Sequence, residues 1–426
     1  MLTDKVKRVK RVSTQLSSVS IDIRNKALES IAIKLIENSE FILKENKKDL
    51  EAAKDISSSL YKRLILSTDK LDDIVSGIRS VILLTDPLGR EQLKRELDDG
   101  LCLTKFSVPI GVIGVIFESR PDALVQIASL FIKSGNSGIL KGGKEAIYTN
   151  RALFSTIIEA LSEVSPLLAS SLELAESRED IKEILALDKY IDLMIPRGGN
   201  ALVQFIKNNT KIPVMGHTDG ICHLYMDRNG SLDMGVKLTV DSKCQYPAVC
   251  NAIETLLVDE KIANEFLPKV KVALEEQNVE LRGCSETLKI IDINSATAED
   301  WDTEYNDYIL SIKIVSDVKE AIEHINIHGS GHTDSIVTQN DDSWELFLMN
   351  VDSASVYLNA STRFADGNRY GFGAEVGVST NKIHARGPVG LEGLTIYKYK
   401  LVGNGHIVDD YAKGVKNYTH RDLPCV

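Results

Sequence analysis

The spacing of hydrophobic positions changes along the chain and divides it into regions. Over residues 21–54, and again over 60–84, apolar side chains recur at roughly helical spacing among many charges, which predicts amphipathic helices. The run at 109–117 is instead almost continuously apolar and β-branched, as is typical of a strand buried on both faces. The pattern therefore predicts a helical N-terminal region that leads into a sheet.

After that run, short apolar segments alternate with helical ones, and the alternation occurs twice. The first series has expected strands at 138–141, 192–195 and 212–215 and expected helices at 123–133 and 201–207. The second series has expected strands at 254–258, 289–293, 309–315, 334–338 and 355–358, with a helix at 261–276. Such alternation indicates βαβ units and parallel sheets, so the predicted fold class is α/β with two such units.

Composition limits the classes of function. The chain has 426 residues, 43% hydrophobic and 26% charged, which suits a soluble globular protein of two or three domains. Its 50 Lys and Arg against 61 Asp and Glu give a formal charge of −11, which disfavours nonspecific attraction to nucleic acid or anionic membranes. Anionic ligands must therefore be held by local basic clusters. The longest candidate for a membrane span, near 108–117, is far shorter than the ~20 residues required.

The N-terminus and the cysteines indicate a reducing compartment. The N-terminus is basic but lacks the apolar core and cleavage site of a signal peptide. A mitochondrial presequence is a weaker alternative, because Asp4 intrudes and the helical pattern begins almost at once. The six cysteines are scattered and have no metal spacing, as expected of free thiols. We therefore expect a cytoplasmic protein.

Cys250 is the strongest candidate for chemistry. Segment 241–259 sets it between a polar, Pro-containing turn and an apolar run. The thiolate is the nucleophilic form of cysteine, and nearby cations and backbone N–H groups favour it. Lys243 and the turn can supply both. The alternative is that Cys250 is a small buried hydrophobe, which is the usual role of a free cysteine.

Segment 241–259, which continues after Cys250 as Asn-Ala-Ile-Glu-Thr-Leu-Leu-Val, resembles the catalytic-cysteine segment of the γ-glutamyl phosphate reductases, a family of the aldehyde dehydrogenase superfamily. The resemblance recurs in the family's order at 108–122, 138–146, 195–200, 328–334, 359–367, 373–388 and 397–400. It therefore spans nearly the whole chain. Residues 119–126 are most similar to the reductase half of the eukaryotic pyrroline-5-carboxylate synthases, whose kinase half has no counterpart here.

The resemblance implies an aldehyde-dehydrogenase-like architecture with three parts. These are a Rossmann-type NADPH-binding domain at 1–94 and 108–226, a second α/β, catalytic domain at 227–385, and a small β oligomerisation arm at 95–107 and 386–426. Asp98-Asp99-Gly100 can turn a hairpin, and 393–402 alternates like an exposed or edge strand. In the superfamily such a tail pairs with a hairpin, so we expect 393–402 to pair near 95–105 and the chain to form a homo-oligomer.

Several residues are candidates for holding the cofactor. A Gly-rich turn between strand and helix lets backbone N–H groups approach a phosphate, and Arg197-Gly198-Gly199 offers such a turn with a cation. Alternatively, the Gly-Gly pair only forms the turn after a strand, where such pairs are common. The resemblance places Lys141 and Lys144 near the adenosine ribose, where a lysine can face a 2′-phosphate and favour NADPH. Either can instead be a solvated loop residue, and for Lys144 the two alternatives have equal weight. Glu304 matches the glutamate that holds the nicotinamide ribose in aldehyde dehydrogenases.

Candidates for the substrate are Arg363, His332 and Lys243. Guanidinium suits bidentate anion binding, so Arg363, or nearby Arg369, can clamp a carboxylate or phosphate, and either can instead form a structural ion pair. His332 can orient the substrate or be a hydrogen-bonded loop histidine, as can His328. No further ligand residue accompanies these two histidines at a metal-binding spacing, so no zinc site is expected.

The chain departs from the superfamily at two places. Hydrolytic aldehyde dehydrogenases use a glutamate as the base for thioester hydrolysis, and the corresponding segment 214–221 has none. The register of the superfamily's oxyanion asparagine falls at or beside Arg120-Pro121-Asp122, so Arg120 and the Cys250 N–H are provisional oxyanion donors.

The family implies a small-molecule enzyme of L-proline biosynthesis. It would reduce L-glutamyl 5-phosphate with NADPH through a Cys250 thioester, giving L-glutamate 5-semialdehyde and phosphate. A separate glutamate 5-kinase is a possible partner. Two alternatives remain, an oxidative aldehyde dehydrogenase, which the missing glutamate disfavours, and a non-catalytic binding protein, which would be expected to lose Cys250 or the Arg197 turn.

Overall fold

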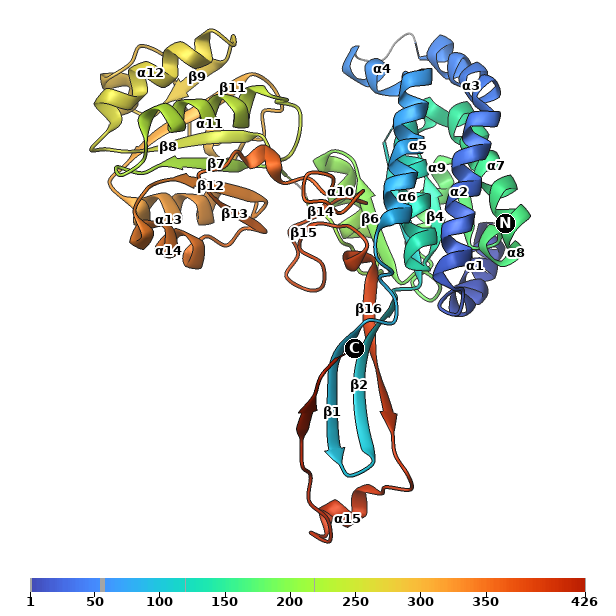
Figure 1. Ribbon diagram of the computed structural model, residues 1–426. Coiled ribbons are helices and arrows are strands. Elements are labelled where there is room, and N and C mark those ends of the chain that lie inside the picture. Colours follow the sequence, from blue (N-terminus) through green and yellow to red (C-terminus); the bar gives the residue numbers. More distant parts are fainter. Residues whose placement is uncertain (1, 54–57, 119, 218, 426) are drawn as a thin grey trace.

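The structure is a computed structural model that describes residues 2–53, 58–118, 120–217 and 219–425. Two α/β lobes lie side by side, and a long β arm projects from the first lobe near the junction between them (Figure 1). Each lobe contains one parallel sheet, and the sheet of the arm is antiparallel. This architecture confirms the predicted α/β fold class.

The first lobe contains a four-stranded sheet with the order β5-β4-β3-β6, all parallel. Its strands are β3 (Val112–Phe117), β4 (Ser137–Lys141), β5 (Leu172–Ala175) and β6 (Leu193–Arg197). Every residue of β3 is buried, as its continuous apolar run predicts. The expected strand at 212–215 is wrong, because these residues contribute only the isolated bridge between Met194 and Val214.

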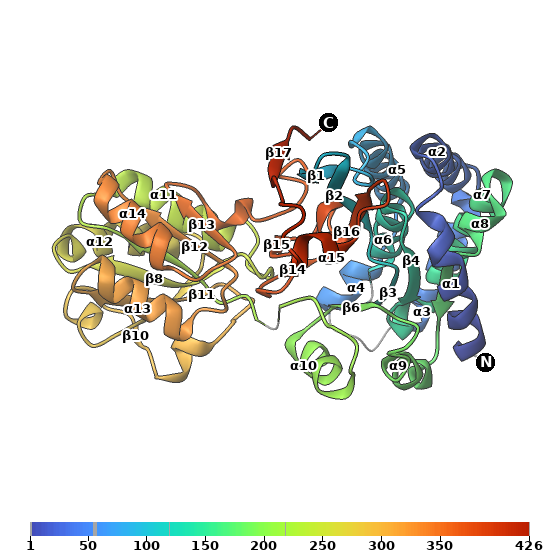
Figure 2. The same ribbon diagram turned by 90° about the horizontal axis from the view of Figure 1, so that it is seen from below.

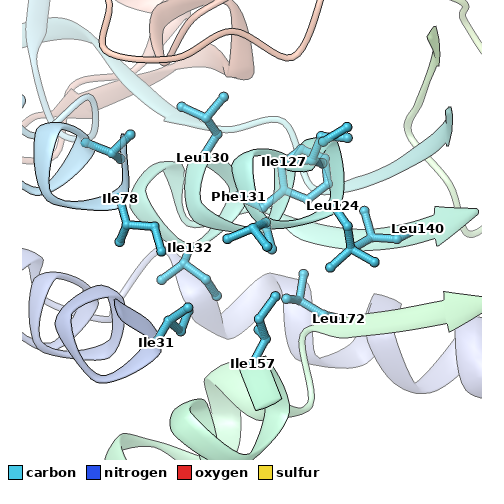
Figure 3. Close-up of a cluster of buried hydrophobic side chains, with 14 of the residues drawn as sticks. Ile31, Ile78, Leu124, Ile127, Leu130, Phe131, Ile132, Leu140, Ile157 and Leu172 are labelled. Carbon is cyan, nitrogen blue, oxygen red and sulfur yellow. The ribbon is translucent and has the colours of Figure 1, made fainter. Parts of the chain in front are cut away.

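Helices cover this sheet and form the first core (Figure 3). They are α1 (Leu2–Leu16), α2 (Ile21–Glu37), α3 (Ser39–Ala52), α4 (Ser58–Leu64), α5 (Thr68–Leu83), α6 (Pro121–Ser134), α7 (Ile147–Val164), α8 (Pro166–Ala169), α9 (Arg178–Leu185) and α10 (Asn200–Asn209). The helix expected at 21–54 is in fact two, divided at Asn38. Helix α6 is buried on nearly all sides, because Phe131 packs with residues of the sheet while Ile31 and Ile78 of α2 and α5 close the same cluster.

The second lobe contains a seven-stranded parallel sheet with the order β10-β9-β11-β8-β7-β12-β13. Its strands are β7 (Cys222–Met226), β8 (Ile253–Asp259), β9 (Glu280–Gly283), β10 (Asn294–Ser295), β11 (Ile309–Val315), β12 (Thr333–Val337) and β13 (Ser355–Leu358). Its helices are α11 (Leu232–Cys244), α12 (Ala263–Glu275), α13 (Val318–His328) and α14 (Asp341–Asn350). The strand expected at 289–293 is wrong, because these residues follow the 3-10 turn η2 (Thr287–Lys289) and Ile291 fills the core from a loop.

The arm is a four-stranded antiparallel sheet with the order β16-β2-β1-β17. Strands β1 (Glu91–Asp98) and β2 (Leu101–Pro109) form the hairpin predicted at 98–100, where Gly100 has a φ of 72°. Strand β16 (Thr395–Val402) pairs with β2, as expected, and β17 (Arg421–Leu423) pairs with β1 beyond the short helix α15 (Val408–Ala412). Seven of the eight residues of β16 are exposed, so its alternating pattern does not mark a buried face.

The chain crosses between the lobes at positions that differ from the expected boundaries. Strand β7 belongs to the second sheet, so the first lobe ends before Cys222 and not after 226. Val376, Val389 and Leu394 pack into the core of the first lobe, so the chain returns there before 385. The short strands β14 (Val378–Ser379) and β15 (Gly387–Pro388) lie between the lobes (Figure 2). Strand β1 also places the start of the arm before residue 95.

In the described part of the chain, the helices are too short or too polar to cross a membrane.

Candidate active site

Cys250 lies in the loop that connects α11 to β8, and two contacts fix its backbone. Its carbonyl oxygen accepts a hydrogen bond from the Cys222 Sγ at 3.2 Å. On the other side lies Gly220, where an added Cβ would come 2.3 Å from the same oxygen. Only glycine fits at residue 220 without moving the cysteine. The Cys250 side chain itself is half-buried, so it is partly accessible to a ligand.

Two nearby thiols are less suited to nucleophilic attack. Burial raises the pKa of Cys222 well above its usual value, and it raises the pKa of Cys244 to about 11. Both therefore stay protonated near neutral pH, and a thiol is a poor nucleophile compared with a thiolate.

The cysteine loop is tied to the turn η4 (Thr362–Phe364) of the same lobe. The Asn251 side chain donates to the Ala365 carbonyl at 2.9 Å, and the Arg363 Nε donates to the Gln245 side chain at 3.0 Å. Arg363 is mostly buried, and Cys250, in its ionised form, is among the groups that act on its charge. Burial and Arg369 lower the pKa of Arg363, and Cys250 opposes that shift. The structure thus brings the predicted substrate cation close to the predicted nucleophile.

Two histidines complete the surroundings of the sulfur. A ring nitrogen of His217, a ring nitrogen of His332 and the Cys250 sulfur lie within 4.8 Å of one another. The two rings meet edge-on, with centroids 5.0 Å apart. His332 was a sequence candidate, whereas His217 was missed, although it lies in segment 214–221, which lacks the hydrolytic glutamate. His328 lies elsewhere, with its Nδ1 2.8 Å from Asp302.

Arg197 leaves the end of β6 and reaches the region between the lobes. Its Cδ lies 3.3 Å from the position of an added Cβ at Gly377, in the segment that crosses back between the lobes. Burial lowers the pKa of Arg197, and Glu375, Arg120 and the Cys250 thiol also act on it. The Arg197 side chain therefore lies close enough to Cys250 for the two groups to interact electrostatically. The sequence had assigned it only to the glycine turn that follows it.

The turn that follows Arg197 already holds a carboxylate. Gly199 is the N-cap of α10, and its N–H donates to Glu118 Oε1 at 2.8 Å. An added Cβ at Gly198 would lie 2.8 Å from the same oxygen. The turn lies at the carboxyl ends of β3 and β6, where the strand order reverses and where ligands of open α/β sheets bind. A phosphate can use the Gly199 N–H only if Glu118 moves.

The two predicted lysines follow β4 and differ in burial. Lys141 ends the strand, is 5% exposed, and its Nζ donates to the Gly142 carbonyl at 2.5 Å. Burial lowers the pKa of Lys141, while Asp180 and Glu176 oppose the shift. Lys144 begins the 3-10 turn η1 (Lys144–Ala146) and is exposed. Lys141 is thus the more constrained of the two.

Three further candidates have contrasting environments. Glu304 is half-buried, and burial raises its pKa, while His217 and the Gly220 N–H, both close to Cys250, oppose the shift. Lys243 is fully buried on α11, and its Nζ lies 2.5 Å from Glu254 Oε2. That ammonium is therefore paired inside the lobe and is not the free cation that the sequence suggested. Arg120 is exposed at the N-cap of α6 and forms an ion pair with Asp122.

The two α/β lobes and the antiparallel arm define an aldehyde-dehydrogenase-like fold. An acetylating aldehyde dehydrogenase from Geobacillus thermoglucosidasius superposes with a TM-score of 0.67 over 95% of this chain and 97% of its own, at 16% identity, which shows a shared fold. No protein-family model matches the chain.

The γ-glutamyl phosphate reductase of Acetivibrio thermocellus is 55% identical over 98% of this chain and 97% of its own. That of Brachyspira hyodysenteriae is 53% identical over 99% of each chain. The crystal structure of the Thermotoga maritima reductase matches with a TM-score of 0.93 at 42% identity, over 95% of this chain and 99% of its own. The chain belongs to the γ-glutamyl phosphate reductase family, which confirms the resemblance found in its sequence.

Proposed function

We propose that this chain catalyses the NADPH-dependent reduction of L-glutamyl 5-phosphate to L-glutamate 5-semialdehyde and phosphate, a step of L-proline biosynthesis. The observation that carries the proposal is the placement of Cys250, half-buried and beside Arg363 in a chain of this family. A nucleophile next to a fixed cation suits a substrate that carries an acyl phosphate.

Cys250 is the group that changes covalently in this reaction. Its thiolate attacks the acyl carbon, the C–S bond forms, the C–O bond to phosphate breaks, and phosphate leaves with the electron pair. After reduction of the thioester the C–S bond breaks, the semialdehyde leaves and the thiolate returns. Arg363 holds an anionic group of the substrate, and Arg197 adds a second positive charge near the sulfur. Arg120 and the Cys250 N–H are the proposed donors to the carbonyl oxygen.

The first lobe offers groups for the cofactor, which supplies the hydride when bound. The glycine turn at Gly198 and Gly199 lies at the N-terminus of α10, where its N–H groups would donate to phosphate oxygens. The hydrogen bond between the Gly199 N–H and Glu118 would first have to break. Lys141 and Lys144 would meet a 2′-phosphate, which favours NADPH over NADH. Glu304, next to the cysteine loop, would hold the nicotinamide ribose.

Segment 214–221 argues against the oxidative alternative. It contains His217 and Asp219 but no glutamate, so the base that hydrolytic dehydrogenases use is missing. That absence suits an enzyme whose thioester accepts hydride and not water. The non-catalytic alternative is disfavoured because Cys250 and the Arg197 turn are both retained.

The reverse reaction tests this proposal. NADP reduction by glutamate 5-semialdehyde should depend saturably on phosphate or arsenate, because phosphate must cleave the thioester. Arg363→Ala should raise the concentration of phosphate or semialdehyde required. Arg386→Ala is the matched control, since that guanidinium is paired with Asp352. Full-rate oxidation without phosphate, with free glutamate as product, would restore the oxidative alternative.

The reductase would work in the cytoplasm as a homo-oligomer assembled through the arm. Its substrate is a labile acyl phosphate, so a separate glutamate 5-kinase is the partner expected to supply it. Co-sedimentation of the two enzymes is the corresponding measurement.

A further inference from the structure

The residues around the Cys250 sulfur have the composition of a metal site. His217, Cys250 and His332 come from three separate segments, yet their ligand atoms lie within 4.8 Å of one another. Sequence spacing did not indicate this set, because it paired His332 with His328. The structure instead places His332 beside His217, with an interplanar angle of 80° between the rings.

Hydrogen bonds orient both imidazoles, and one of these bonds fixes the tautomer of its ring. The His217 Nδ1 lies 2.9 Å from the Val378 carbonyl, which can only accept, so Nδ1 carries the hydrogen and Nε2 keeps a lone pair. The His332 Nδ1 lies 2.8 Å from the Thr333 hydroxyl, which can accept the Nδ1 hydrogen when Nε2 binds a metal. Metal-bound histidines are usually oriented in this way, through a partner for the second ring nitrogen.

The Nε2 of His332 provides an independent indication of a ligand. His332 is fully buried, and this nitrogen has no hydrogen-bond partner among the residues described. A buried polar atom without a partner is unfavourable and calls for an explanation. A metal ion shared with Cys250 and His217 would satisfy it.

We propose that His217, Cys250 and His332 form a binding site for Zn²⁺ that holds the cysteine in a metal-bound form. Two imidazole nitrogens and one thiolate are ligands that zinc favours, whereas magnesium and calcium prefer oxygen. Zinc–ligand bonds of about 2.0–2.3 Å require the three side chains to move slightly inward. Binding releases the thiol proton, and the fourth position stays open to water or an anion.

The charges nearby are compatible with a divalent cation. Cys250 is among the groups that act on Arg197 and Arg363, and His217 is among those that act on Glu304 and Glu375, so two cations and two carboxyl groups surround the site. When ionised, the two carboxyl groups oppose the charge of the two guanidinium groups, and a metal-bound thiolate adds a further negative charge. While zinc holds the sulfur, Cys250 cannot attack an acyl phosphate, so the metal would be a reversible inhibitor. This consequence rests on the proposed function, but the binding itself does not.

Cobalt replaces zinc in such sites and reports its ligands by absorption. The full chain titrated with Co²⁺ should develop a thiolate-to-cobalt charge-transfer band that saturates at one site and disappears on addition of Zn²⁺. Cys250→Ser should lack the band. His217→Asn and His332→Asn should each bind at least about tenfold more weakly. In His217→Asn the amide nitrogen can still donate to the Val378 carbonyl, so the variant removes only Nε2.

Cys244→Ser is the control, because that cysteine lies outside the set of ligands and should leave the band unchanged. A melting curve for each variant separates lost ligands from lost fold. Absence of the band in the wild type, its persistence in Cys250→Ser, or full affinity in both histidine variants would overturn the proposal.

Alkylation tests the site without any turnover. Zn²⁺ at saturation should slow the reaction of Cys250 with iodoacetamide at least tenfold, and EDTA should restore it. An unchanged rate would overturn the proposal. Since neither alkylation nor the cobalt spectrum requires the reductase reaction, either proposal can fail while the other stands.

Discussion

Gly220 and Cys250 approach so closely that no side chain fits between them. An added Cβ at residue 220 would lie 2.3 Å from the Cys250 oxygen and 2.4 Å from its Cα. Gly220→Ala should therefore push the nucleophile out of place and lower kcat/KM by on the order of 100-fold, the usual effect of displacing a reacting group by about 1 Å.

Gly216→Ala in the same segment is the control. There the nearest atom is Pro196 Cγ at 3.4 Å, an ordinary contact, so the activity should change little. Equal activity of the two variants in the reverse assay would show that the contact with Cys250 does not position the nucleophile.

Lys141→Ala should weaken the binding of NADPH far more than that of NADH. The loss of a charge-assisted contact to the 2′-phosphate is worth about 1–3 kcal/mol. Fluorescence titration with both cofactors measures the difference. Lys144→Ala, at the exposed neighbour, should have a smaller effect. Equal losses for NADPH and NADH in Lys141→Ala would point to a folding defect.

His324 should make the stability of the second lobe sensitive to acid. Burial lowers its pKa to about 2, and its neighbours His223, Lys313 and His328 add to the shift. Its folded pKa lies below the ordinary value, so neutral His324 stabilises the fold above about pH 6.5 and that stability is lost as the pH falls. Between pH 8 and pH 5 the loss should be about 2 kcal/mol.

His324→Asn keeps an acceptor for the Lys313 ammonium, which lies 3.2 Å from Nδ1, but it cannot titrate. The variant should be less stable at pH 8 and should lose less stability on acidification. Urea unfolding at both pH values gives the comparison, and parallel losses in the two proteins would exclude His324 as the source.

The arm should hold copies of the chain together through β16. In the described part of the chain this strand pairs only with β2, and Tyr399 and Leu401 are more than half exposed. An unpaired apolar edge favours association with another strand. Leu401→Lys should therefore shift sedimentation velocity profiles towards the monomer, whereas Lys400→Ala on the opposite face should not. A wild-type monomer at micromolar concentration would contradict this prediction.

The fold was predictable where burial alone determines residue type. Strand β3 is buried on both faces, so each position is apolar and the run is visible in the sequence. The apolar run at 289–293 gave the wrong element, because Ile291 contributes to the core from a loop. The break at Asn38 was also missed, since polar residues occur on both sides of it.

The candidate site was predictable where a residue stands in a motif of its own. Cys250, His332 and Arg363 lie in recognisable segments, and the structure brings them together. Gly220 acts through a contact that becomes visible only in the fold. Lys243 was misleading for a similar reason, because α11 directs its ammonium to Glu254 inside the lobe although it is close to Cys250 in sequence.

The most direct test of the central claim is a burst experiment in phosphate-free buffer. If Cys250 forms a thioester that only phosphate releases, semialdehyde and NADP should give a burst of NADPH stoichiometric with the enzyme, followed by a stall. Intact-mass analysis should then find the acyl group on Cys250, added phosphate should restart turnover, and Cys250→Ser should show no burst. Continued turnover without phosphate, or a burst that persists in Cys250→Ser, would contradict the account.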